Sequence, residues 1–253
     1  MPRFAPLAVA LALAATALPA QAQSTFDPAN MSDAEREAFR AEVRAYLLDN
    51  PEVIMEAVAV LDQRKAEQQV AQDSTLVQVN ADAIRDDGYS WVGGNPDGDV
   101  TVVEFLDYRC GYCRKAFEEV KRLIEADGGV RFVVKEYPIL SEESLVAARF
   151  AVATKQVAGD DAYEQVHDAM MTYNGSYDET ALTRLAEGFG IEPQPILDRM
   201  DSDEVTREIA ETRALAQRLQ INGTPSFVIG DQMLRGYAPL ATMQAMVEDA
   251  RAE

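Results

Sequence analysis

The stretch VTVVEFLDYRCGYCRKAFEEVKRLIEA, residues 100–126, decides the fold. Residues 100–108 are rich in β-branched and apolar side chains, a composition that predicts a buried strand. From residue 112 to residue 126 the apolar residues recur at helical spacing. The chain has two cysteines, Cys110 and Cys113. Both therefore lie where a strand turns into a helix.

Three interpretations of this Cys-x-x-Cys pair compete. A structural disulfide across two intervening residues removes little entropy from the unfolded chain. A zinc site needs two more ligands, but the chain has no third cysteine and one histidine, His167, and the carboxylates show no ligand spacing. A pair that cycles between dithiol and disulfide needs nothing more. The sequence therefore favours a redox pair, with no metal and no cofactor beyond the Cys110–Cys113 disulfide.

The position of the pair predicts different roles for its two thiols. Cys110 falls at the start of the predicted helix, where free N–H groups and the helix dipole lower a thiol pKa. Arg109, Arg114 and Lys115 add positive charge nearby. We expect Cys110 to be exposed and to attack first. Cys113, one helical turn further on, is expected to be buried and to resolve the mixed disulfide.

The first residues have the layout of a secretory signal peptide. Arg3 precedes an apolar run, residues 7–18, and Ala20-Gln21-Ala22 has the small-x-small pattern of a cleavage site. The run is too short for a membrane-spanning helix. We therefore predict cleavage after Ala22 and a periplasmic protein that does not insert into the membrane. Export also places the cysteines where disulfides persist.

The net charge excludes some classes of partner. The chain has 23 basic and 43 acidic residues, a formal charge of −20. Such a chain repels phosphate backbones and anionic membrane surfaces, so nucleic-acid binding is not expected.

Residues 32–85 read as helical. Ser32 is a candidate cap for the first helix, and Asn50-Pro51 restarts the helix further along. A Gly/Asp/Pro-rich stretch, residues 86–99, then predicts a boundary and a loop. An amphipathic arm of this kind either packs on its own domain or covers its face with a second copy. The pattern alone leaves both possibilities open.

Three separated motifs resemble the exported DsbA family of disulfide oxidoreductases, within the thioredoxin superfamily. They are VVEFLDYRCGYCRK (102–115), VRFVVKEYPIL (130–140) and GTPSFVIG (223–230) followed by RGY. The resemblance implies an α/β thioredoxin fold over residues 87–253 with a helical insertion at about 141–204. It also implies a cis-proline beside the active disulfide, at Thr224-Pro225. Without the resemblance, the simpler interpretation is that Pro225 is an ordinary trans proline at the start of the strand SFVIG.

The segment YLLDNPEVIMEAV, residues 46–58, resembles the N-terminal segment of ScsC-like proteins (suppressor of copper sensitivity C). That segment mediates self-association in the family. The resemblance therefore implies that residues 23–86 are an N-terminal helical oligomerisation segment and that the protein is a homo-oligomer through residues 32–85.

Two charged residues in the predicted strands are candidates for proton transfer. Glu104 lies inside an apolar strand, on the same face as Val102 and Leu106. A carboxyl buried there would have a raised pKa and could accept the proton of Cys113. The DsbA resemblance also implies an acid at this position. Lys135, in the neighbouring strand, could pair with Glu104.

The remaining candidates are expected to be structural. A lone helical histidine such as His167 is usually packed or solvated. Thioethers can bind copper, but methionines at helical spacing more often belong to a core. The methionines in question are Met170, Met171, Met243 and Met246.

The residues inside the pair indicate which thiol–disulfide activity to expect. Tyr112 carries no positive charge, whereas some related exported oxidases have a histidine there, so the disulfide should be less oxidising. Cys-Gly-Tyr-Cys, with Gly111 and Tyr112, and Thr224 before the proline resemble the disulfide isomerases. We expect an isomerase or reductase acting on protein clients and served by a membrane reductase. A DsbA-like thiol oxidase and a copper-binding or holdase module are the alternatives.

Overall fold

The computed structural model describes residues 28–252. The predicted signal peptide, with its cleavage after Ala22, lies outside these residues. Contacts divide the chain into two compact units, residues 1–60 and residues 61–253. Within residues 28–252, no helix combines the length and the apolar character needed to cross a membrane.

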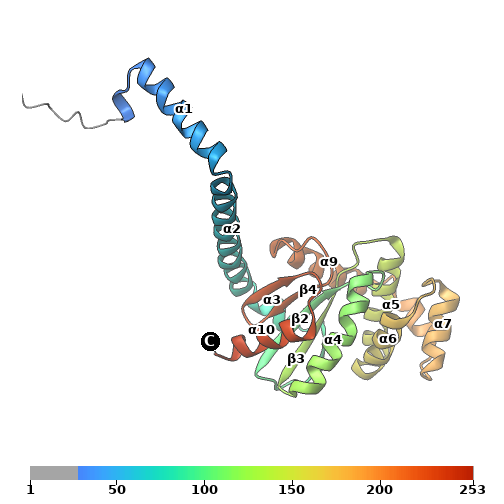
Figure 1. The fold of residues 1–253 in the computed structure, drawn as a ribbon. Coiled ribbons are helices and arrows are strands. Elements are labelled where there is room, and N and C mark those ends of the chain that lie inside the picture. Colours follow the sequence, from blue (N-terminus) through green and yellow to red (C-terminus); the bar gives the residue numbers. More distant parts are fainter. Residues whose placement is uncertain (1–27, 253) are drawn as a thin grey trace, which may run out of the picture. The chain divides into compact units, whose positions relative to one another are not determined.

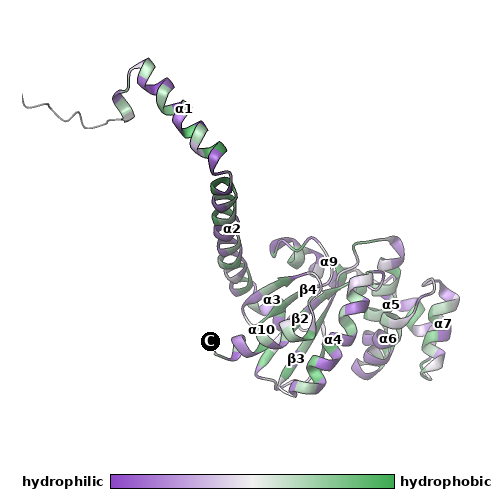
Figure 2. Cartoon of the chain, in the orientation of Figure 1, coloured by the Kyte–Doolittle hydropathy of each residue, from purple (hydrophilic) through white to green (hydrophobic). Residues whose placement is uncertain are grey.

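The first unit is helical. A short 3-10 helix, Pro28–Asn30, precedes α1 (Asp33–Asp49) and the beginning of α2 (Glu52–Val79). Ser32 caps α1 as predicted, because its side chain accepts the N–H of Glu35 while the Glu35 carboxylate accepts the N–H of Ser32 at 2.8 Å. No residue of α1 is buried, and Figure 2 shows hydrophobic residues spread along both helices.

The second unit is built on a five-stranded mixed sheet (Figure 1). The strand order is β1-β3-β2-β4-β5. Strands β2 and β3 are parallel, and the other neighbours are antiparallel. The bounds are β1 (Trp91–Gly94), β2 (Val100–Leu106), β3 (Val130–Glu136), β4 (Ser226–Ile229) and β5 (Gln232–Arg235).

Helix α4 (Gly111–Asp127) makes the crossover between the two parallel strands. It ends at Gly128, whose left-handed backbone (φ 66°) lets its N–H bond back to the Ile124 carbonyl. Four helices then follow β3, in the region of the predicted insertion. They are α5 (Glu142–Ala158), α6 (Asp160–Thr172), α7 (Glu179–Gly188) and α8 (Pro193–Arg199). Together with the sheet they form the thioredoxin-like fold with a helical insertion that the sequence predicted.

The two faces of the sheet bury separate apolar cores. Val102, Leu106 and Val134 face a cluster that also contains residues of α4 to α8 and of α10 (Leu240–Ala252). Val103 and Val133 face a second cluster, which includes residues of α9 (Asp203–Arg218). Side chains alternate between the two faces along a strand. Each charged side chain of β2 or β3 therefore points into one of the two clusters.

The end of α2 belongs to the second unit. Val77 in α2 and Ile84 in α3 (Ala81–Arg85) are fully buried in the second cluster. The Asp73 carboxylate accepts a hydrogen bond from Arg235 Nη2 at 2.9 Å, and Arg85 pairs with Asp231 at 2.7 Å. The division at residue 60 therefore falls upstream of the boundary predicted at residue 86, because the last turns of α2 supply core residues.

Candidate active site

Cys110 caps the N-terminus of α4, directly after the loop that leaves β2. Its backbone is extended (φ −78°, ψ 114°), and its sulfur accepts the N–H of Cys113 at 3.3 Å. The Cys110 N–H donates to the Asp107 carbonyl at 2.9 Å, which closes the loop. The sulfur thus lies where the free N–H groups of the helix start and the helix dipole stabilise an anion.

A second loop meets Cys110 from far along the chain. The Thr224–Pro225 peptide bond is cis, rather than the ordinary trans form that the residues alone left open. Cys110 Sγ donates to the Thr224 carbonyl at 3.2 Å. The Thr224 side-chain oxygen is buried and has no partner in the described part of the chain while both cysteines are thiols. It is therefore available to donate to the sulfur once Cys110 ionises.

The two thiols have opposite acidities. Hydrogen bonding from the Cys113 side chain lowers the pKa of Cys110 to about 5, with the Thr224 side chain and the N–H groups of Cys113 and Tyr112 adding to this effect against the cost of burial. Burial raises the pKa of Cys113 far above that of a free thiol. Cys110 is therefore a thiolate at neutral pH and Cys113 a protonated thiol. The expected exposure of Cys110 is not found, because the residue is 6% exposed.

Glu104 lies in β2 with its side chain directed into the first cluster, next to the redox pair. It is 2% exposed, and its Oε1 has no hydrogen-bond partner in residues 28–252. Burial, with smaller contributions from the charges of Cys110 and Glu136, raises its pKa to about 8. The charge of Glu104 in turn raises the pKa of Cys113. The Glu104 carboxyl is thus protonated at pH 7, and it interacts electrostatically with both thiols.

The predicted pairing of Lys135 with Glu104 is wrong. The register places Val134 beside Glu104, so Lys135 projects from the opposite face of the sheet. There Lys135 Nζ contacts the Asp87 carboxylate at 2.5 Å and the Ala83 carbonyl at 3.0 Å. Lys135 is fully buried, and this ion pair ties the segment before β1 to the back of the sheet.

The three cations around the pair are held by other partners. Arg109 Nε lies 3.2 Å from Glu143 Oε2, and Arg114 donates to the Tyr108 carbonyl at 3.0 Å. Lys115 Nζ sits 4.0 Å from the centre of the Tyr237 ring. These side chains join the active-site loop to neighbouring elements. The leading causes of the low Cys110 pKa are instead hydrogen bonds to its sulfur.

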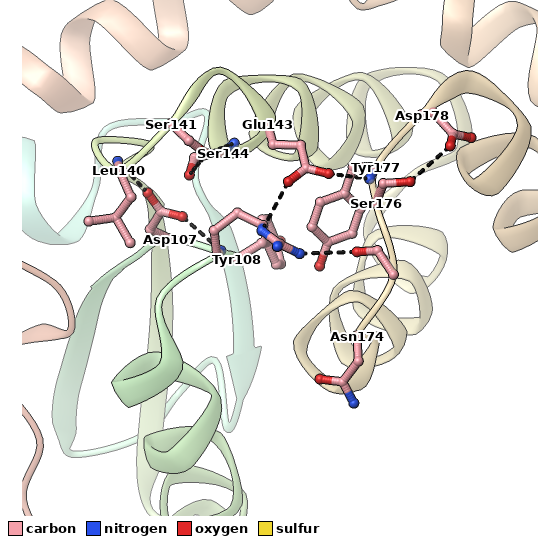
Figure 3. A network of polar contacts seen from close by, with 12 residues as sticks. Asp107, Tyr108, Leu140, Ser141, Glu143, Ser144, Asn174, Ser176, Tyr177 and Asp178 are labelled. Atoms are coloured by element: carbon pink, nitrogen blue, oxygen red, sulfur yellow. Dashed lines mark hydrogen bonds and ion pairs between the residues drawn. The ribbon is translucent and has the colours of Figure 1, made fainter.

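A polar network that the sequence did not reveal holds the active-site loop against the helical insertion. Asp107 accepts the N–H groups of Ile139 and Leu140 at 2.9 and 3.1 Å. Glu143, at the start of α5, accepts the N–H of Tyr177 at 3.0 Å. Figure 3 shows Asp107 directed at Leu140, and Glu143 and Tyr177 joined across the gap between their segments. An acid directly after a buried strand was the only available signal for Asp107.

A second buried acid was also missed. Glu136 ends β3 on the same sheet face as Glu104, and burial raises its pKa to about 8. Its Oε1 accepts hydrogen bonds from Tyr108 at 2.7 Å and from Tyr163 at 2.6 Å. Tyr108 Oη also lies 3.0 Å from Nδ1 of His167. Glu104 was found because it is an acid in an otherwise apolar strand. Glu136 has the same pattern and could have been found in the same way.

The structure places the remaining candidates in the core. Met170, Met171 and Met243 are buried in the first cluster. Between residues 28 and 252, no three histidine, cysteine, aspartate or glutamate side chains gather closely enough to hold a metal ion.

The arrangement joins a thiolate at a helix start, a buried partner thiol, a cis-proline loop and a buried acid on a thioredoxin fold. The fold and the arrangement of these groups are those of a DsbA-like thioredoxin domain with a Cys-x-x-Cys pair. The chain belongs to the DSBA-like thioredoxin domain family, whose model matches residues 101–248. Residues 35–68 match the copper resistance protein ScsC N-terminal domain.

Two solved structures illustrate the similarity. A thioredoxin-like oxidoreductase from Silicibacter pomeroyi is 44% identical, covers 69% of this chain and 99% of its own, and superposes with a TM-score of 0.65. Proteus mirabilis ScsC in a compact conformation is 25% identical, covers 85% of this chain and 98% of its own, and has a TM-score of 0.64.

Among curated proteins, the chain is 26% identical over 159 residues to the Na(+)/H(+) antiporter NhaA 3 of Salinispora tropica, covering 63% of this chain. The chain spans 24% of the length of that relative.

Proposed function

We propose that this protein is a periplasmic thiol–disulfide oxidoreductase that reduces and isomerises disulfides in protein clients. The observation that carries the proposal is the contrast between the two thiols. Cys110 is a thiolate with a pKa of about 5 that contacts the cis-proline loop, and Cys113 is a fully buried thiol. A nucleophile that is ionised at neutral pH, followed by a protonated resolving thiol, suits attack on a disulfide.

In the proposed reaction, the Cys110 thiolate attacks one sulfur of a client disulfide. The client S–S bond breaks, a Cys110–client bond forms, and the other client sulfur leaves as a thiolate. That thiolate attacks a sulfur of a second client disulfide, which forms a new client S–S bond and releases a different client thiolate. The released thiolate attacks the client sulfur bound to Cys110, which forms a second new client disulfide and returns the Cys110 thiolate. Alternatively Cys113 attacks the Cys110 sulfur, which releases the reduced client and leaves the Cys110–Cys113 disulfide. A reductase, proposed to be a membrane protein, then restores the dithiol.

Glu104 is proposed to accept the proton of Cys113 when Cys113 attacks the mixed disulfide. While Cys110 is a thiolate, its negative charge contributes to the raised pKa of Glu104. Formation of the mixed disulfide removes that charge, so the Glu104 carboxyl becomes more acidic at that stage. The resulting carboxylate can take the Cys113 proton as Cys113 attacks. Glu104 thus becomes able to accept the Cys113 proton only after the mixed disulfide has formed.

Client binding is proposed at exposed apolar side chains that the active-site network positions. Tyr112, between the cysteines, is 64% exposed, and Leu140 is 55% exposed. Asp107 binds the N–H of Leu140 with its side chain and the N–H of Cys110 with its carbonyl. Apolar side chains beside the nucleophile suit unfolded clients, which expose hydrophobic segments.

Self-association through the N-terminal helices is the second part of the proposal. The exposed apolar residues of this region include Val43, Tyr46, Leu48, Ile54, Met55 and Val58. This region lies within the match to the ScsC N-terminal domain. Several active sites held around one client raise the local concentration of thiols, which favours isomerisation over simple oxidation.

The test is reactivation of scrambled, fully oxidised ribonuclease by the mature protein in a mildly reducing buffer without glutathione. An Ile54→Lys/Val58→Lys variant removes two exposed apolar residues of α2. A Gln63→Lys/Gln68→Lys variant adds the same charge on the same helix and is the matched control. We expect the wild type and the control to reactivate ribonuclease and to form oligomers, and the Ile54/Val58 variant to lose both properties.

Other outcomes separate the alternatives. Rapid oxidation of reduced ribonuclease without reactivation of the scrambled form would identify an oxidase. Chaperone activity or copper capture that persists without redox cycling would identify a holdase or copper module. A Cys110→Ser variant that loses all activity in copper-free buffer would exclude that module.

A further inference from the structure

The second buried acid, Glu136, is connected by side-chain hydrogen bonds to His167, which lines the same pocket as Glu104. Glu136 Oε1 accepts from Tyr108 Oη at 2.7 Å, and Tyr108 Oη lies 3.0 Å from His167 Nδ1. His167 and Glu104 line the same pocket, which opens to solvent and has a volume of about 150 Å³. Tyr108, His167 and Glu136 are each less than a tenth exposed.

From these contacts we infer that Tyr108 and His167 form a proton relay that moves one proton between Glu104 and Glu136. The inference rests on the proposed function, because the relay serves the step in which Glu104 accepts the Cys113 proton. It assigns roles to three residues beyond the redox pair and Glu104.

The tautomers of His167 define the relay. Burial lowers the pKa of His167 to about 4, so the neutral ring has one donor and one acceptor nitrogen. When Glu136 is ionised, Tyr108 donates to Glu136, His167 Nδ1–H donates to Tyr108, and Nε2 is an acceptor. When Glu136 is protonated, Glu136 donates to Tyr108, Tyr108 donates to Nδ1, and Nε2 carries the hydrogen. Because Tyr108 occupies Nδ1, Nε2 is the nitrogen that remains for the pocket.

The proton transfer balances without any further reactant than a water molecule in the pocket. Glu104 gives its proton to the water, which passes one proton to His167 Nε2. The Nδ1 proton moves to Tyr108 Oη, and the Tyr108 proton moves to Glu136. The pocket is wide enough for water, whose share of liquid volume is about 30 Å³. Glu104 ends as a carboxylate ready to accept from Cys113.

Energies and surroundings are compatible with transfer in both directions. Burial raises the pKa of Glu104 and of Glu136 to about 8 in each case. At pH 7 the relay therefore operates in the fraction of molecules in which Glu136 is ionised, and there the proton has nearly equal affinity for either end. The charge of Glu136 also raises the pKa of Glu104, which favours one shared proton over two carboxylates. The other charged groups lining the Glu104 pocket are Lys121, Glu125, Glu164 and Asp168. Glu136 lines a second pocket, whose other charged lining groups are Lys155 and Glu208.

The structure offers a matched control for this relay. Tyr163 donates to the same Glu136 oxygen at 2.6 Å and is as buried as Tyr108, but His167 Nδ1 bonds Tyr108. Tyr108→Phe and Tyr163→Phe each remove one hydroxyl group from Glu136, and only Tyr108→Phe breaks the relay. His167→Phe breaks the relay at a second point and preserves a flat ring next to Trp91 and Tyr163.

The experiment is rapid-mixing oxidation of the reduced full-length protein by oxidised glutathione, with acid quenching and mass spectrometry. The first step, attack by Cys110, yields the mixed disulfide with glutathione. The second step, attack by Cys113, yields the internal disulfide. At pH 7 we expect Tyr108→Phe and His167→Phe to slow the second step about tenfold, below the 10²–10⁴ (roughly) typical of a primary acid or base. The first step should stay close to wild type in all variants. Tyr163→Phe, which removes a hydrogen bond to Glu136 and leaves the relay intact, should slow the second step clearly less than either relay variant.

The pH dependence separates a relay from packing. In the mixed disulfide the pKa of Glu104 lies below the value of about 8 found with the Cys110 thiolate. Above that lowered pKa the carboxyl ionises without help, so the deficit of both relay variants should shrink as pH rises. Wild-type second-step rates in both relay variants would overturn the inference, as would equal slowing of all three variants at every pH. If wild type performs neither step, the proposed function itself fails. Glu136→Gln gives an additional break in the relay should one variant not fold.

Discussion

Replacement of Thr224 by valine should raise the pKa of the Cys110 thiol. The Thr224 hydroxyl is buried, lacks another partner in the described chain, and helps to lower the pKa of Cys110 to about 5. Valine has nearly the same shape but no hydroxyl, and the Thr224 carbonyl that contacts Cys110 Sγ is retained.

The size of the shift follows from the free energy of one hydrogen bond. A hydrogen bond to a charged group contributes about 1.5–3 kcal/mol. Since one pKa unit corresponds to about 1.36 kcal/mol, loss of this donor should raise the Cys110 pKa by about 1 to 2 units. With a pKa of about 6 to 7, at least about half of Cys110 would still be thiolate at pH 7, so the Thr224→Val variant should react more slowly with iodoacetamide chiefly below pH 7.

The assay is the absorbance of the thiolate near ~240 nm during acid titration of the reduced protein, with iodoacetamide rates as a second readout. Cys113→Ser serves to assign the signal to Cys110. An unchanged pKa in Thr224→Val, with the fold intact by circular dichroism, would refute the role given to the hydroxyl. A pKa near that of a free thiol in the wild type would refute the assignment of Cys110 as the nucleophile.

The acidity of Cys110 also predicts how the reduced protein responds to pH. A folded-state pKa of about 5, below the ordinary thiol value of 9.0, stabilises the reduced fold above the unfolded pKa and loses this effect as pH falls through 5. The free energy of unfolding of the dithiol, relative to the disulfide form, should therefore decrease on acidification, as measured by urea titration at a series of pH values.

Three further predictions concern the buried charges. Asp87→Ala leaves Lys135 unpaired in the core and should lower the free energy of unfolding by about 3–5 kcal/mol, whereas Asp87→Ala with Lys135→Met should recover much of that loss in urea titrations. Glu104→Gln should slow attack by Cys113 on the mixed disulfide about 10²-fold at neutral pH while iodoacetamide still reacts with Cys110 at the wild-type rate. The raised pKa of Glu104 means that stability falls as pH rises from its ordinary 4.5 through about 8, so Glu104→Gln should flatten this dependence, and an unchanged profile would contradict the burial of a neutral acid.

Local patterns were sufficient for most of the fold. β-branched and apolar composition placed β2, and helical spacing placed α4 directly after it, because both patterns depend on neighbouring residues. The segment that contains β3 was marked by its resemblance to the DsbA family. The Ser32 cap is also a local interaction and was predicted correctly. The cysteine pair could be located for the same reason, since its place at a strand-to-helix junction follows from residues 100–126 alone.

Tertiary structure decided what depends on residues far apart in sequence. Lys135 could be placed near Glu104 from its strand, but the parallel register directs it to the opposite face, where Asp87 is its partner. Thr224 meets Cys110 across 114 residues of sequence. The connection of Glu136 through Tyr108 to His167 joins a strand, a loop and a helix.

The sequence by itself thus determined the elements, the redox pair and the acid beside it, because periodicity and spacing record local geometry. Only the tertiary structure decided which charges meet, which partners hold the active-site cations, and how Glu136 is connected through Tyr108 to His167. Those properties depend on strand register and on helix packing, and neither is encoded within a single segment.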